Sequence, residues 1–286
     1  MLNNFRSKQA ILIVAIILLV GFLFTRDVKG LVKPKDDGQQ ASTVQTAQTP
    51  TISIEEVSAT AKNLIGESTA KEISALEAAY KGADAAEKLA YAEQLAQKWD
   101  DVEQAIPSAM YAEIVANGQA TLKNWLLAGG RFLKAFKTTQ DTVVQPVMLQ
   151  KANAAFTSAL AIDSTSNEAK TGLGVTIVNG MGAPMQGIAM LLEVVKKDPK
   201  NLEANMNLGM FAIKSGQFDK AIIRFNDIIS NIKATPDAYF YLATAYESLG
   251  KNQQAIDAYL NSKKLAANPT LSKFIDEQVV KLKNKR

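Results

Sequence analysis

The stretch that decides the fold reads LGMFAIKSGQFDKAIIRF at Leu208–Phe225 and recurs as LATAYESLGKNQQAIDAY at Leu242–Tyr259. In the first copy Leu208, Gly216, Ala221 and Phe225 stand where the second copy, 34 residues later, has Leu, Gly, Ala and Tyr. A step of 34 residues is the period of a helix–turn–helix repeat. Apolar residues recur three and four positions apart in both copies, which is the spacing of one helix face. The sequence therefore predicts stacked pairs of helices.

These residues resemble the tetratricopeptide repeat (TPR). Leu208-Gly209, Gly216, Ala221 and Phe225 follow that family's pattern of small and large residues, and DPKN at 198–201 resembles the turn between two repeats. An earlier copy fits if one residue is inserted near 182–184, and its matching residues are Leu173-Gly174, Gly187, Leu191 and Val194. The resemblance implies an all-α fold, a right-handed α-solenoid of helix pairs.

The repeated residue types have a physical reason. Small side chains at Gly209 and Ala221 let the two helices of a repeat approach closely, while Phe225 fills the space beside them. Gly216 and Gly250 stand where the first helix must end, a position that favours a left-handed backbone. One repeat cannot bury its apolar face alone, so neighbours must stack and the last repeat needs a cap. We expect that cap in a helix and basic tail at 270–286.

The repeats are expected to fill residues 121–269. Their first unit places Trp125, Gly129 and Phe132 on one helix and Phe156 on the next. In that unit the linking stretch 137–146 is about ten residues longer than the motif allows, which predicts an irregular connection. Residues 52–120 show helical periodicity without the repeat's residues. They form either further TPR-like pairs or an irregular helical region.

The N-terminus carries an apolar run, AILIVAIILLVGFLF at Ala10–Phe24, between Arg6 and Lys8 on one side and Arg26 on the other. No small-residue cleavage site follows it, which favours a retained signal anchor over a removed signal peptide. We expect a short cytoplasmic tail at 1–9, a transmembrane helix at 10–25 and a disordered linker at 26–51. The expected location is the inner membrane, single-pass, with the folded part in the periplasm; basic residues beyond the run leave the opposite orientation open.

Composition excludes several functions. The 286 residues include no Cys and no His, so Ser-His-Asp and Cys-His catalysis, zinc sites and disulfides are impossible. The net charge of +4 comes from 32 basic and 28 acidic residues, which is too even a balance for a nucleic-acid partner. The sequence indicates no enzyme activity, no cofactor, no metal and no catalytic residues. Asp100, Asp101 and Glu103 form a carboxylate group beside Trp99 that is more typical of a solvated turn.

The candidate binding site is the concave face, because in the family that the repeats resemble, ligands lie along the first helices. The corresponding positions in this chain are Val175, Val178, Met206, Met210, Ile213, Phe240, Thr244 and Glu247. Methionine suits adaptable binding surfaces, although the same side chains could simply be half-buried between repeats. Some relatives clamp an acidic C-terminal tail with Lys, Asn and Arg. Met206 and Met210 stand where that clamp needs polar groups, so this chain departs from it.

The sequence thus predicts a membrane-anchored TPR scaffold that binds a protein or peptide partner at the cell envelope, in assembly, secretion or maturation of envelope proteins. Homo-oligomerisation stays open. The first alternative is a translocon-associated or chaperone-like holder of unfolded client proteins. A carboxylate-dependent hydrolase around Asp100 is a third reading, and it would need two opposed carboxylates in a pocket.

Overall fold

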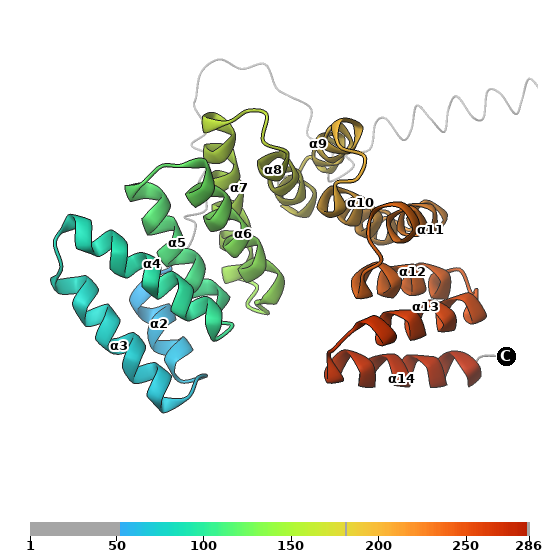
Figure 1. Ribbon diagram of the computed structural model, residues 1–286, viewed down its shortest axis with the longest axis horizontal. Helices are drawn as coiled ribbons and strands as arrows, with labels where there is room; N and C mark the ends of the chain where they lie inside the picture. Colours follow the sequence, from blue (N-terminus) through green and yellow to red (C-terminus); the bar gives the residue numbers. More distant parts are fainter. Residues whose placement is uncertain (1–51, 181, 285–286) are drawn as a thin grey trace, which may run out of the picture. The chain divides into compact units, whose positions relative to one another are not determined.

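The computed structural model describes residues 52–180 and 182–284, and in this part of the chain every regular element is helical (Figure 1). This confirms the all-α class. The expected segments 1–9, 10–25 and 26–51 lie outside the described residues. Within the described ones, no helix combines the length and the apolar character that crossing a membrane requires.

The helices follow one another with short connections. Their bounds are α2 (Ile54–Lys62), α3 (Glu67–Gly82), α4 (Ala85–Asp101), α5 (Ala105–Gly118), α6 (Leu122–Thr138), α7 (Val144–Ile162), α8 (Asn167–Gly180), α9 (Pro184–Lys197), α10 (Leu202–Lys214), α11 (Phe218–Asp227), α12 (Pro236–Ser248), α13 (Asn252–Leu265) and α14 (Pro269–Asn284). A π-helical turn at Ile228–Ile232 extends α11.

Successive helices pack as pairs, and each pair packs on the next. Helices α6 and α7 form one pair, α8 and α9 the second, α10 and α11 the third, and α12 and α13 the fourth. Helices α4 and α5 form a similar pair that joins the series through α5 and α6, while α2 lies against α5. Helix α14 packs on α13 and buries Ile275, Val279 and Leu282. It occupies the segment where the cap is expected.

Glycines make the close helix crossings possible. A Cβ atom on Gly209 would lie 2.6 Å from the ring of Phe225, which is completely buried. The ring of Phe156 is confined in the same way, because a Cβ would lie 2.8 Å from it on Gly129 of α6 and 2.3 Å from it on Gly172 of α8. Real Cβ contacts are not this short, so a larger residue would require the ring or the helices to shift.

The ends of the first helices confirm the predicted role of the repeated glycines. Gly216 and Gly250 have φ angles of 73° and 69°. After each glycine the next backbone N–H bonds back to a carbonyl of the last helical turn, from Gln217 to Ala212 and from Lys251 to Tyr246. This is the Schellman arrangement, which needs a left-handed residue and therefore favours glycine.

The expected long connection after α6 is wrong. Only residues 139–143 separate α6 from α7, because the additional residues lengthen the helices instead. Helices α6 and α7 have 17 and 19 residues, whereas α12 and α13 have 13 and 14. The Asp141 carboxylate accepts hydrogen bonds from the backbone N–H groups of Val143 at 2.8 Å and Val144 at 3.1 Å, which satisfies donors at the start of α7.

Candidate interaction face

The expected site residues lie on three first helices, of which α10 lies beside both α8 and α12. On α8, Val175 is only 2% exposed and belongs to the hydrophobic core, so it cannot contact a partner directly. Val178 is half-buried, and one of its methyl groups would be 2.7 Å from a Cβ on Gly187. Both valines thus pack internally, where α8 and α9 cross closely.

The residues on α10 lie differently. Met206, Met210 and Ile213 are half-buried and border the hydrophobic cluster that α11 to α14 build. They recur at intervals of four and three residues along one face of α10. This places three flexible or branched apolar side chains in a row that solvent still reaches.

The residues on α12 belong to an aromatic cluster. The ring of Phe240 lies 5.6 Å from that of Tyr259 and 5.9 Å from that of Phe274 on α14, measured between centroids. The Tyr259 hydroxyl donates to the Glu247 carboxylate at 3.0 Å, and the Thr244 hydroxyl donates to the Phe240 carbonyl at 3.0 Å. Phe240 and Glu247 therefore also join α12 to its neighbouring helices, whereas the Thr244 bond stays within α12.

The face also carries acidic residues that the sequence reading missed. Glu168, Glu203 and Asp237 each lie in the first turn of α8, α10 and α12, where a carboxylate interacts favourably with the helix dipole. Glu203 and Asp237 stand 34 residues apart, and this repeat spacing could have predicted them from the sequence. These three residues place one carboxylate at the amino end of each of three neighbouring first helices.

Two of these carboxylates line a pocket of about 330 Å³. Apolar side chains of Leu126, Leu133 and Phe156 contribute to its lining, and Glu168 and Glu203 lie at its wall. Although part of the Glu203 side chain reaches solvent, loss of water in the pocket raises the pKa of its carboxyl group. The charge of Lys137 offsets this rise in part. Lys134 and Lys137 line the same pocket, which is thus an apolar hollow whose rim carries two glutamates and two lysines.

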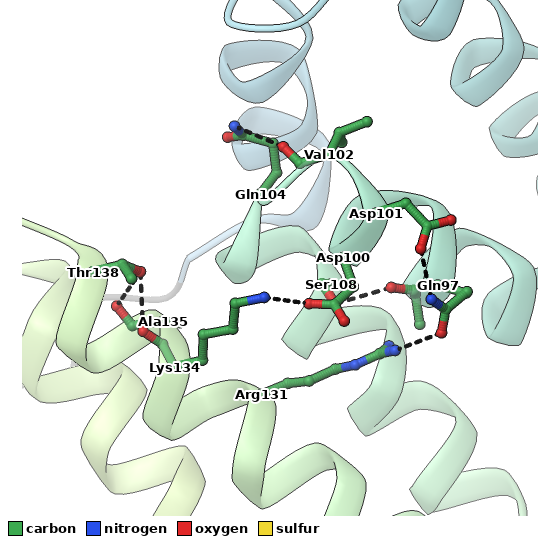
Figure 2. A network of polar contacts seen from close by, with 11 residues as sticks. Gln97, Asp100, Asp101, Val102, Gln104, Ser108, Arg131, Lys134, Ala135 and Thr138 are labelled. Carbon is green, nitrogen blue, oxygen red and sulfur yellow. Dashed lines mark hydrogen bonds and ion pairs between the residues drawn. The ribbon is translucent and has the colours of Figure 1, made fainter. Parts of the chain in front are cut away.

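The carboxylates around Asp100 form ion pairs and hydrogen bonds with other side chains (Figure 2). Lys134 of α6 contacts Asp100 at 2.6 Å, and the Gln97 amide donates to Asp101 at 2.7 Å. Arg131 of α6 reaches the Gln97 amide oxygen at 3.2 Å. Asp100 thus faces a lysine and not a second carboxylate, which is the geometry of a contact that joins α4 to α6. In residues 52–180 and 182–284, no cluster of three or more acidic side chains could hold a metal ion.

Comparison with known proteins supports the repeat. The family model of the tetratricopeptide repeat matches residues 237–276, which cover α12, α13 and the start of α14. Residues 237–276 therefore form a tetratricopeptide repeat, as the repeated residues predict. It is similar to anaphase-promoting complex subunit 3 of Dictyostelium discoideum, with 32% identity over 127 residues. That match takes 43% of this chain and spans only 13% of the relative's length.

Solved structures of other repeat proteins are similar at lower identity. YrrB, described as a TPR protein with an unusual peptide-binding site, is 15% identical with a TM-score of 0.41, and the alignment covers 65% of this chain and 91% of YrrB. MamA from Desulfovibrio magneticus RS-1 is 16% identical with a TM-score of 0.43, and the alignment covers 57% of this chain and 86% of MamA.

Proposed function

We propose that this chain is a non-catalytic scaffold that binds a segment of a partner protein along the first helices of its repeats. The observation that carries the proposal is the row of Met206, Met210 and Ile213 on α10, which is apolar and still reached by solvent. Methionine side chains are flexible and polarisable, so such a row can adapt to a ligand. Protein–protein interaction is also the role that a tetratricopeptide repeat implies.

The charge around this row restricts the partner. Glu203 lies at the amino end of the same helix, with Glu168 and Asp237 at the amino ends of α8 and α12, and these carboxylates would repel an acidic peptide. Lys134 and Lys137 offset this charge only at the pocket beside Glu168 and Glu203. This agrees with the absence of clamp residues at Met206 and Met210. An apolar segment without acidic residues fits the face better than an acidic tail.

The proposal is tested by replacing Met210 with glutamate. We expect at least tenfold weaker capture of the partner that cross-links to position 210 in membranes, because a charge would have to be desolvated in the contact. Exposed Leu265 on α13, replaced by glutamate, provides the matched control, and circular dichroism checks that both variants stay helical. Phe240 is unsuitable for this test because its ring contacts Tyr259 and Phe274. Unchanged capture by the Met210 variant would contradict the proposal.

A chaperone-like holder of unfolded clients is the alternative. It predicts that a photo-reactive residue at position 210 cross-links to many clients, whereas a scaffold saturates with one partner. The hydrolase reading has no support in the geometry, because Asp100 contacts Lys134.

We further propose that a signal anchor at 10–25 holds the repeats at the inner membrane, with the folded part in the periplasm. The support is the uninterrupted apolar run at Ala10–Phe24 and the polar linker that follows it. Protease added to intact spheroplasts is expected to degrade the repeats. Protection that is lost only after lysis would reverse the orientation, and release of the intact chain from membranes by salt washing would contradict the anchor itself.

A further inference from the structure

A second groove shares only Thr138 with the pocket described above. It has a volume of about 470 Å³ and is bordered by α2, by the amino end of α5 and by the connection between α6 and α7. Its apolar lining is formed by Val57, Ala61, Leu64, Ile106, Pro107 and Val144. Leu64 is 71% exposed, so its side chain is accessible to a partner.

The charged residues of this groove are all acidic. Glu56, Glu103 and Asp141 line it, and its described lining includes neither lysine nor arginine. Within the described part of the chain, none of these three carboxylates takes part in an ion pair. The amino end of α5 contributes only a partial positive charge, about half an elementary charge, against three carboxylates. The groove is therefore electronegative.

Glu103 lines this groove with an energetically unfavourable backbone conformation. Its φ angle is 58°, and among the described residues it is the one non-glycine residue with positive φ. Its N–H bonds to the Asp100 carbonyl, and the N–H of Gln104 bonds to the Trp99 carbonyl. Gly216 and Gly250 end their helices with the same pair of bonds. Glycine would fit the turn after α4 without strain, yet this turn presents a carboxylate to the groove.

We propose that this groove binds an apolar segment of a partner protein that carries lysine or arginine. The apolar lining would bury the partner's aliphatic side chains, and Glu56 and Glu103 would pair with its cations. Negative charge at the rim disfavours an anionic lipid surface or a nucleic acid in the same place. This binding goes beyond the interaction proposed for the first helices and uses different residues.

The test uses the full chain and two fluorescent 14-residue helical peptides. Both carry leucine on one face, and the other face carries lysine in one peptide and glutamate in the second. Fluorescence anisotropy is expected to show binding of the lysine peptide at least tenfold tighter than of the glutamate peptide, and weaker binding as salt is raised. Equal binding of both peptides, or no binding of the lysine peptide at millimolar protein, would overturn the proposal.

Variants locate the binding. Glu103→Gln and Glu56→Gln keep the shape of the groove and should each weaken the lysine peptide about two- to fivefold, as exposed ion pairs do. Leu64→Ser should weaken it further, whereas Leu265→Ser on α13 should leave it unchanged. Binding that none of the groove variants alters would place the peptide elsewhere and refute the assignment. So would concentration-dependent dimerisation in sedimentation that Leu64→Ser abolishes, because the groove would then take a second copy of the chain.

The Glu103→Gly variant separates the effect of the carboxylate on peptide binding from its effect on stability. Removing the strained residue is expected to raise the thermal midpoint by about 2–4 °C, while peptide binding becomes weaker. Tryptophan fluorescence, to which Trp99 in the last turn of α4 contributes, reports the midpoint. A variant that is both more stable and equally able to bind the lysine peptide would show that the carboxylate has no binding role.

Discussion

Replacing Phe156 with alanine is expected to lower the free energy of unfolding by about 3–5 kcal/mol, because neighbouring side chains cannot move in to fill the cavity that the ring leaves. Phe156 is 3% exposed, and its ring fills the space above Gly129 of α6 and Gly172 of α8. Since glycine has no side chain to move into the cavity, the lost contacts are recovered only if the helices shift. The ring thus holds two successive repeats together.

The effect is measured by urea unfolding followed by circular dichroism. Leu127 on α6 offers a matched control, because it is 44% exposed and its replacement by alanine should cost about 1 kcal/mol or less. A decrease of the same size in the free energy of unfolding of both variants would show that the contacts of the Phe156 ring make no special contribution. Because repeat arrays can unfold in steps, the midpoints of separate transitions are compared when they are resolved.

A complementary substitution tests the glycine side of the same contact. Gly172→Ala should destabilise the protein by about 1–3 kcal/mol, because its methyl group would meet the Phe156 ring. In a Phe156→Leu background the same change should cost less, since leucine leaves room at that position. Additive effects of the two substitutions would contradict direct contact between residues 156 and 172.

The repeated part of the fold could be predicted from sequence because each repeated residue has a local reason. Gly216 and Gly250 each predict a left-handed turn, and Gly209 with Phe225 predicts a close helix crossing. The structure has both turns and the crossing. The connection after α6 could not be predicted in this way. A repeat period shows how many residues lie between two fixed points, but additional residues can lengthen either the helices or the loop.

The candidate site was less predictable than the fold. Register within the repeat placed Val175 with Met210, yet Val175 is buried and Met210 is half-buried. The difference comes from Gly174 and Gly187, where a Cβ on Gly187 would lie 2.5 Å from the Gly174 carbonyl oxygen. This crossing is closer than the repeat pattern alone implies. The left-handed backbone of Glu103 could not be predicted from the sequence either, since glutamate does not favour such a conformation.

The contact between α4 and α6 contains a buried charge whose removal is expected to stabilise the protein. Arg131 is 7% exposed, and burial lowers the pKa of its guanidinium, although the charges of Asp100 and Asp101 oppose this. Its one hydrogen bond to a described residue goes to the Gln97 amide oxygen. Asp100 directs its carboxylate to Lys134 instead, at 2.6 Å. The guanidinium therefore loses water without gaining a close ionic partner.

Arg131→Met is expected to raise the free energy of unfolding by about 1–3 kcal/mol, because methionine fills a similar volume without a charge to desolvate. Gln97→Leu should have the opposite effect and cost about 1–3 kcal/mol, since it removes that bond and leaves a buried charged donor unpaired. In the Arg131→Met background the Gln97→Leu change should cost much less, because only the exposed hydrogen bond from Gln97 to Asp101 is then lost. Urea unfolding followed by tryptophan fluorescence, to which Trp99 contributes from a position two residues after Gln97 in α4, measures all three variants. If Arg131→Met destabilised the protein, the guanidinium would have to make a net favourable contribution to joining α4 and α6, and the argument from desolvation would be wrong for this contact.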